Sequence, residues 1–284
     1  AVTSFLPSSG GNWISSHPGV ATITNSGLVT GISAGTSRFI FIQTSTGCSS
    51  DSSQYITVKA RPMVSITGPG SICAGATTTV SPSTGGIWTS SDNAIATINS
   101  EGTVFGVSQG QATFRFLAND SQCQSDATSP VIVNSKPIIS FTGPTSICIG
   151  ANTTISPSTG GTWSSSNNSI AQITLSGVIT AISAGTATFT FTSTSTGCVS
   201  SVSTPLTVIG RPIVSVSGPQ SICIGTTTTL SPSSGGTWSS SNSMVASVNN
   251  AGVVTGITQG SVVFYFTETS TGCISNATLP ITVN

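Results

Sequence analysis

Cysteines are the residues of this chain whose type and spacing could do chemistry. They stand at positions 48, 73, 123, 148, 198, 223 and 273. Six of them form three pairs at an interval of 50 residues: Cys73 with Cys123, Cys148 with Cys198, and Cys223 with Cys273. Zinc is the competing interpretation, but two cysteines without a histidine give too few ligands for a closed site. The spacing therefore predicts three disulfides, which are bonds that persist outside the cytosol.

The seventh cysteine, Cys48, has no partner at this interval, because its counterpart would fall before residue 1. We expect Cys48 to be unpaired within this segment, and the chain to begin inside a repeating unit. Each predicted disulfide would close a loop of about 50 residues, which contributes roughly 4 kcal/mol in the chain-entropy description.

Other reactive side chains do not form a recurring site. His17 is the single histidine, and aspartate, asparagine and asparagine replace it in the later repeats. The six acids do not recur either, so neither paired carboxylates, a calcium loop nor a serine–histidine–acid arrangement can be assembled. The sequence predicts a protein that is not an enzyme and that has no cofactor, catalytic residue or metal site.

The charge balance and the hydropathy pattern exclude two classes of partner. Lys and Arg total six, as do Asp and Glu, so the formal net charge is zero. Nucleic acid is an unsuitable partner for such a chain, because phosphate binding relies on clustered basic residues. No apolar run is long enough to span a bilayer, so we expect no membrane insertion in this segment.

A pattern that recurs every 75 residues divides the chain into four repeats. Repeat 1 is residues 1–62 and is incomplete, repeat 2 is 63–137, repeat 3 is 138–212 and repeat 4 is 213–284. A basic residue and a proline mark each junction, at Pro62, Pro137 and Pro212. Proline restricts its own φ and that of the preceding residue, so we expect short, stiff, extended linkers.

Within repeat 3 the pattern is that of β-strands. Residues 138–141 and 153–155 are β-rich, and residues 170–174 and 178–182 read as a hairpin around Gly177. Residues 186–192 alternate polar and apolar, which predicts one half-buried strand with Phe189 and Phe191 on the buried face. The last strand of each complete repeat is expected to begin with a proline, at Pro130, Pro205 and Pro280.

The order Cys, Trp, Cys and about seven short strands in each repeat predict an all-β chain of tandem immunoglobulin-like β-sandwiches, arranged as an elongated array. The four tryptophans occupy the same place in their repeats and are expected in the core rather than on an exposed sugar-stacking surface. They are Trp13, Trp88, Trp163 and Trp238.

These residues also carry a family resemblance. Trp163-Ser164-Ser165-Ser166, Ala171, Ile173, Gly177, Ile179-Thr180, Ile182, Gly185 and Phe189 resemble the core pattern of the bacterial immunoglobulin-like domain of group 2. The pattern begins again at the other three tryptophans. The Ser-Thr-Gly-Cys turn is also similar to that of repetitive surface adhesins of gliding bacteria, which are exported by the type IX route.

The resemblance implies a secreted, cell-surface location and a structural role, in which rigid repeats form a stalk or filament segment that projects an adhesive tip. The partners would be neighbouring repeats and other copies in a filament. Two alternatives remain: repeats that themselves bind glycan or matrix, and subunits of a donor-strand filament. The spacing of residues does not identify a ligand, a tip domain or the length of the parent chain.

Overall fold

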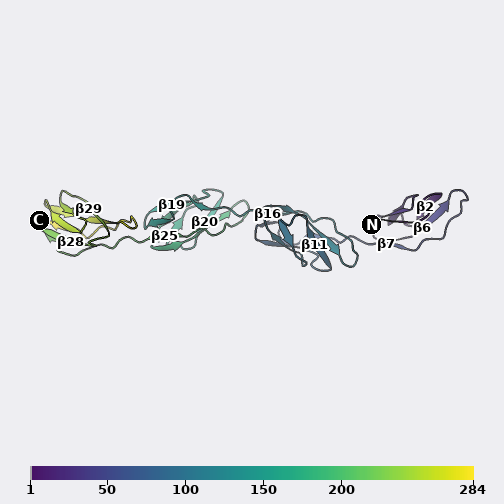
Figure 1. Ribbon diagram of the computed structural model, residues 1–284, viewed down its shortest axis with the longest axis horizontal. Coiled ribbons are helices and arrows are strands. Elements are labelled where there is room, and N and C mark those ends of the chain that lie inside the picture. The colour runs from purple at the N-terminus through teal and green to yellow at the C-terminus, as the bar shows by residue number, and fades with distance from the viewer. Residues whose placement is uncertain (1) are drawn as a thin grey trace. The chain divides into compact units, whose positions relative to one another are not determined.

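The chain is built from strands and turns. The computed structural model describes residues 2–284, and that range contains no helix (Figure 1). The contacts divide the chain into two compact units, Ala1–Ser135 and Lys136–Asn284, each of which contains two of the predicted repeats. The all-β prediction is confirmed.

Among residues 2–284, each set of paired strands lies within a single repeat. Repeat 1 contains β1 (Val2–Ser4), β2 (Gly11–Ser15), β3 (Ala21–Ile23), β4 (Leu28–Gly31), β5 (Gly35–Ser37), β6 (Phe39–Gln43) and β7 (Ile56–Val58). Repeat 2 contains β8 (Ser65–Ile66), β9 (Ser71–Cys73), β10 (Thr77–Ser81), β11 (Gly86–Ser90), β12 (Ala96–Ile98), β13 (Thr103–Gly106), β14 (Gly110–Ala112), β15 (Phe114–Ala118) and β16 (Val131–Asn134).

The second unit repeats this order. Repeat 3 contains β17 (Ser140–Phe141), β18 (Ser146–Cys148), β19 (Asn152–Ser156), β20 (Gly161–Ser165), β21 (Ala171–Ile173), β22 (Val178–Ala181), β23 (Gly185–Ala187), β24 (Phe189–Ser193) and β25 (Leu206–Ile209). Repeat 4 contains β26 (Ser215–Val216), β27 (Ser221–Ile222), β28 (Thr227–Ser231), β29 (Gly236–Ser240), β30 (Ala246–Val248), β31 (Val253–Gly256), β32 (Gly260–Val262), β33 (Phe264–Glu268) and β34 (Ile281–Val283).

Each complete repeat has three sets of paired strands. In repeat 3 they are a four-stranded sheet of order β17-β19-β22-β21, a three-stranded sheet of order β18-β25-β23, and the pair β20-β24. All neighbours are antiparallel except β18 and β25, which run parallel. Buried side chains alternate with exposed ones along β19 and with half-buried ones along β24, so one face of each strand lies in a shared core, as expected for a sandwich.

One predicted strand is two strands. Residues 186–192 were expected to be continuous, but the chain changes sheets at Thr188, between β23, which pairs with β25, and β24, which pairs with β20. Thr188 keeps its backbone bonded at the change: its N–H donates to Ser166 Oγ at 2.9 Å, and its carbonyl accepts from the Ser166 N–H at 2.8 Å. The alternation of polar and apolar residues continues through Thr188 because β23 and β24 bury the same side of the chain.

The hairpin around Gly177 forms as predicted, with β21 and β22 antiparallel. Gly177 has φ of 78°, and a Cβ there would lie 2.1 Å from the carbonyl oxygen of Ile155. Glycine is therefore required at this position both by the left-handed backbone and by the close approach of β19.

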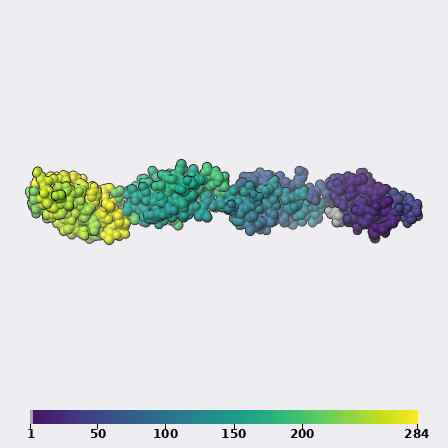
Figure 2. Space-filling view, turned by 90° about the horizontal axis from the view of Figure 1, so that it is seen from above, coloured from purple at the N-terminus to yellow at the C-terminus, as the bar shows by residue number. Residues whose placement is uncertain are grey.

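Tryptophan and phenylalanine fill the core of each sandwich. Phe189 and Phe191 are buried, as are Trp88 and Trp238, while Trp13 and Trp163 are half-buried. Each indole N–H reaches the carbonyl of the proline six residues earlier, at 2.9–3.0 Å. The polar end of each ring is thus bonded while its body packs, which is how buried tryptophan is usually accommodated. In the space-filling view, the residues of repeat 4, in yellow, pack closely together (Figure 2).

Serine hydroxyl groups bond the segment that follows β24 to that strand. In repeat 3, the N–H of Phe191 donates to Ser200 Oγ and the N–H of Phe189 donates to Ser203 Oγ, both at 3.0 Å. The backbone N–H groups of those two serines donate in turn to the carbonyls of the same phenylalanines. The segment after the last turn is consequently held to the strand without being a regular strand, and its serines satisfy the core strand's amides.

Repeat 1 differs from the other three. Its strands β1 to β7 correspond in order to β10 to β16 of repeat 2, and the described residues contain no counterpart of β8 or β9. The last strand, β7, therefore pairs with β5 alone, whereas β16 pairs with both β14 and β9. Ile56 and Val58 of β7 remain half-buried, whereas Val131 and Val133 of β16 are 0% and 1% exposed.

Candidate functional site: the junction between repeats 3 and 4

Cys148 lies at the end of repeat 3 from which the chain leaves for repeat 4, here called the exit end. It is the last residue of β18, and in the parallel ladder it stands opposite Ile209, the last residue of β25. The N–H of the next residue, Ile149, donates to the Ile209 carbonyl at 3.0 Å. Residues 210–212 then lead into repeat 4, so the sulfur of Cys148 is held next to the junction.

Cys198 lies at the opposite end of the same repeat, here called the entry end. β23 runs antiparallel to β25 and so leads away from the exit end, and β24 continues in that direction to Ser193. At about 3.3 Å per residue, Gly185 to Ser193 spans roughly 25 Å. Cys198 follows in the turn after β24. A disulfide requires Cα atoms within about 7 Å, so strand direction alone separates Cys148 from Cys198.

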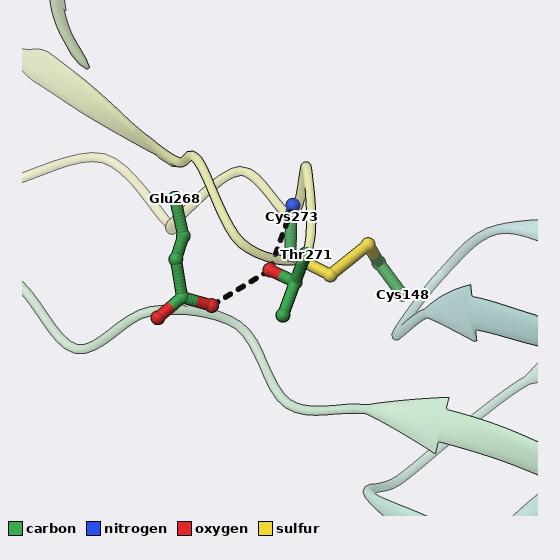
Figure 3. Close-up of a disulfide and its surroundings, with 4 residues drawn as sticks. All are labelled: Cys148, Glu268, Thr271 and Cys273. Carbon is green, nitrogen blue, oxygen red and sulfur yellow. Dashed lines mark hydrogen bonds between the residues drawn. A yellow bond between two sulfur atoms is a disulfide. The ribbon is translucent and has the colours of Figure 1, made fainter. Parts of the chain in front are cut away.

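Cys273 occupies the corresponding turn at the entry end of repeat 4, and there it meets Cys148. The two sulfurs are bonded at 2.00 Å, with the Cα atoms 5.6 Å apart, and the sequence separation of the two cysteines is 125. Figure 3 shows this bond joining the ribbons of the two repeats. Cys273 is fully buried, and its turn is ordered by Thr271, which accepts from the Cys273 N–H at 3.2 Å and donates to Glu268 Oε2 at 2.6 Å.

The predicted pairing within repeats is therefore wrong. Cys148 is bonded to Cys273, and so neither Cys148–Cys198 nor Cys223–Cys273 forms. Cys123 is a free thiol, and so Cys73–Cys123 does not form; Cys73 and Cys198 are themselves disulfide-bonded. Cys48 is free and exposed, as is Cys223. The bond between Cys148 and Cys273 connects repeat 3 to repeat 4 and does not close a single repeat.

The sequence contains a signal that could have revealed this. Two spacings, 50 and 125 residues, join a Ser-Ile-Cys cysteine to a later turn cysteine, and they differ by one repeat. The number of strand reversals between Cys148 and Cys198 places these two cysteines at opposite ends of one sandwich. The corresponding turn of the next repeat, which contains Cys273, lies at the junction beside Cys148. The shorter spacing alone is consistent with one disulfide in each small domain, which is the commoner arrangement.

The junction prolines lie in segments between the strands of successive repeats. Pro137 and Pro212 stand in segments without strand structure, as does Pro62, and each is followed by an apolar side chain that is at least 90% exposed: Met63, Ile138 and Ile213. Among residues 2–284 no three His, Cys, Asp or Glu side chains gather in a way that could hold a metal ion. No helix in that range is long and apolar enough to cross a membrane.

The junction between repeats 1 and 2 has different contacts. Arg61 Nη1 donates to Asp126 Oδ1 at 2.6 Å, between side chains that are 69% and 80% exposed. Lys59 Nζ donates to the Asp120 carbonyl at 3.0 Å. In repeat 4, Asn276 takes the place of Asp126, so this ion pair has no counterpart at the junction between repeats 3 and 4.

Comparisons with known protein sequences found a family match and a similar curated protein. Residues 73–129 match the family described as bacterial Ig-like domain (group 2). Ice-binding protein 1 of Shewanella frigidimarina (strain NCIMB 400) is 30% identical to this chain over 310 aligned positions, which cover 94% of this chain and 33% of that protein. The chain thus spans about a third of the length of this curated relative.

Solved structures of tandem-domain proteins are also similar, at low identity. Invasin, a bacterial integrin-binding protein, is 17% identical, with 91% of this chain and 67% of that chain covered and a TM-score of 0.31. The ICAM-5 D1–D4 fragment is 12% identical, with 100% and 91% covered and a TM-score of 0.30. Domains 1–6 of the surface layer protein SbsC are 13% identical, with 93% and 47% covered and a TM-score of 0.24.

The family match lies in repeat 2, and the same strand order and 75-residue period extend through the other repeats. The resemblance that the sequence predicted is confirmed for residues 73–129, which match the bacterial Ig-like domain of group 2.

Proposed function

We propose that this chain is a structural stalk segment of an extracellular bacterial surface protein, in which disulfides between successive repeats limit bending at their junctions. The observation that carries the proposal is the bond between Cys148 at the exit end of repeat 3 and Cys273 at the entry end of repeat 4. A disulfide inside a sandwich would stabilise that sandwich alone. A disulfide across a junction constrains how two sandwiches move, which is a mechanical property of the array.

The chemistry of the chain supports this proposal. Disulfides persist in oxidising surroundings, which favours a location outside the cytosol. Two connections at one junction, the chain itself near Pro212 and the Cys148–Cys273 bond, constrain hinge motion more than a single linker does. The surface carries few charges and many hydroxyl groups, so its hydration depends little on pH and salt. In this proposal the repeats are spacers and not an enzyme.

Solution scattering tests the stalk role. The oxidised chain is expected to give an extended profile, to which each repeat contributes a few nanometres from strands of about 3.3 Å per residue plus loops. The Cys148→Ser/Cys273→Ser variant should show a broader distribution of maximum dimensions, because the junction between repeats 3 and 4 is then a single linker. Cys223→Ser, which removes a free thiol, is the matched control. A compact profile for the oxidised chain would overturn the proposal.

Direct binding by the repeats is the competing function, and the named relative makes ice one ligand to test beside glycan and matrix. The stalk proposal predicts that the chain neither partitions into growing ice nor binds a glycan array above background. Retention of the chain by either surface, with loss of retention after heat unfolding, would favour the binding role. The partners in the stalk proposal are other domains of the same surface protein.

A further inference from the structure

Residues 136–148 cross repeat 3 from its entry end to its exit end. Hydrogen bonds hold this segment extended, because β17 pairs with β19 and β18 pairs with β25. Between β17 and β18, the N–H of Thr142 donates to β19 and the carbonyl of Thr145 accepts from β25, both at 2.9 Å. At about 3.3 Å per residue, Ser140 to Cys148 spans roughly 25 Å. The segment therefore crosses the repeat with little slack.

Residues 273–284 cross repeat 4 in the same direction. Cys273 lies at the entry end, and its carbonyl accepts from the N–H of the last residue of β33 at 3.0 Å. The N–H groups of Ser275 and Thr278 then donate to carbonyls of β33. β34 follows, antiparallel to β32 and parallel to β27. This segment is thus also held extended, from the entry end of the sandwich to the opposite end.

The bond between Cys148 and Cys273 joins the two segments into one covalent path, here called the disulfide line (Figure 3). The disulfide line contains 13 residues of repeat 3 and 12 residues of repeat 4, whereas the chain from Lys136 to Asn284 contains 149 residues. The other 124 residues, 149–272, form a loop that the disulfide closes. Every strand of repeats 3 and 4 lies in this closed loop except β17, β18 and β34.

A second path across repeat 3 follows its last strand and is here called the linker line. It begins at the entry end with Cys198, which is disulfide-bonded, and it runs through β25 to the linker at Pro212. β18 and β25 are parallel neighbours, so the two lines lie side by side where they leave the repeat. Residues 149–197 belong to neither line.

We propose that repeats 3 and 4 carry tension through the disulfide line and the linker line, and that the rest of each sandwich is shielded from tension. This inference rests on the proposed stalk role. In a chain without disulfides, a pull on the two ends acts across every strand and unfolds each sandwich in turn. Here a pull on residues 136 and 284 passes through the backbone of β17, β18 and β34 and through the sulfur–sulfur bond. The strands of the closed loop are not stretched.

The lengths of the two paths show how strongly the disulfide limits extension. A backbone extends to at most about 3.6 Å per residue, so the 25 residues of the disulfide line reach roughly 90 Å. At a strand rise of about 3.3 Å the same residues already span roughly 80 Å. Without the bond, the 149 residues of the open chain reach roughly 540 Å. The disulfide therefore withholds about 450 Å of extension and makes the two repeats nearly inextensible.

Single-molecule force spectroscopy tests this inference on the full chain. Handles are attached through azide-bearing residues placed at positions 136 and 284. The oxidised chain is expected to lengthen by at most about 20 Å, because the disulfide line is already extended. The Cys148→Ser/Cys273→Ser variant should unfold and reach a length roughly 450 Å greater. Cys223→Ser, which removes a free thiol outside the disulfide line, is the matched control and should behave as the unaltered chain.

A second pair of handles tests the shielding itself. Leu175 and Asn250 are exposed and lie in turns of repeats 3 and 4 inside the closed loop, so handles there load the sandwiches directly. At forces that leave the first pair of handles unmoved, the oxidised chain should unfold and lengthen to as much as roughly 180 Å. This limit is set by the shortest covalent path between the two positions, about 50 residues through the disulfide.

Two results would overturn the inference. One is lengthening of the oxidised chain by the same steps as the Cys148→Ser/Cys273→Ser variant when it is pulled at positions 136 and 284. The other is unfolding at equal force from both pairs of handles, which would show that the closed loop is not shielded. Either result with an extended scattering profile would overturn the tension inference alone, whereas a compact profile would overturn the stalk role.

Discussion

The junction between repeats 3 and 4 and the junction between repeats 1 and 2 have the same turn cysteine but different bonds. At the first, Cys273 is buried and bonded to Cys148. At the second, Cys123 is free and an exposed ion pair, Arg61 with Asp126, is present. The same comparison applies to the sheets, because Ile281 of β34 is fully buried and its counterpart Ile56 of β7 is half-buried.

This difference shows that one short segment has two structural roles. Ile147 of β18 is buried against the last strand of repeat 3, and the next residue, Cys148, is bonded to repeat 4. The sandwich of repeat 3 positions Cys148, and the disulfide of Cys148 constrains the position of repeat 4.

The largest effect should come from removing the disulfide of the junction. Cys148→Ser/Cys273→Ser opens a loop of about 125 residues, which the chain-entropy description values at 4–5 kcal/mol of unfolding free energy. We expect earlier unfolding of repeats 3 and 4 in denaturant, with hydrogen exchange resolved by repeat as the measurement. Cys123→Ser should leave all repeats unchanged. Equal destabilisation by both variants would remove the distinction between the two junctions.

The next largest effect should come from the last strands. Ile281→Ala empties a fully buried site and should cost about 2–5 kcal/mol in repeat 4. Ile56→Ala, at the same register position in repeat 1, should cost clearly less because that side chain is only half-buried. Peptide-resolved hydrogen exchange gives both values. A larger cost for Ile56→Ala would show that the edge of β7 is covered.

A smaller effect concerns the cysteine turn itself. Gln122 has φ of 52°, whereas Gly47, Gly197 and Gly272 occupy this position in the other repeats with φ of 69–72°. Because a side chain in the left-handed region costs about 1 kcal/mol, Gln122→Gly should stabilise repeat 2 by up to that amount. Gly197→Gln should destabilise repeat 3 similarly. Thermal unfolding of the two variants checks the signs, and a loss of stability in Gln122→Gly would contradict the argument.

The smallest effect should come from the ion pair. Arg61 and Asp126 are 69% and 80% exposed, so Asp126→Asn should change stability by at most about 0.5 kcal/mol at low salt. The change should vanish near 1 M salt, where the screening length is about 3 Å. Denaturant unfolding at two salt concentrations measures it. An effect that persists at high salt would indicate a role for Asp126 beyond the exposed pair.

Sequence reasoning predicted the all-β class, the hairpin at Gly177 and the alternating burial of Phe189 and Phe191, because these depend on local periodicity and on one glycine. It missed the change of sheet at Thr188, since a strand that passes between sheets keeps the same alternation. It also missed β18, whose three residues are too few to show a period.

The pairing of the cysteines failed for a different reason. Spacing along the chain does not show at which end of a sandwich a residue lies, and that depends on how many times the strands reverse. Cys148 stands beside Ile209 at the exit end, and Cys198 follows a strand that runs to the entry end. The residues around each cysteine do not show at which end of the sandwich it lies. The repeat period alone therefore cannot distinguish a disulfide within one repeat from a disulfide between two repeats.

Disulfide mapping tests the central claim most directly. Chymotryptic cleavage of the oxidised chain after Phe141, Trp163, Phe191, Leu206, Leu230 and Phe266 places Cys148, Cys198, Cys223 and Cys273 in separate peptides. Mass spectrometry before and after reduction should then find peptide 142–163 joined to the peptide that begins at residue 267. Peptide 142–163 joined to peptide 192–206 would show that disulfides close single repeats and would contradict the account.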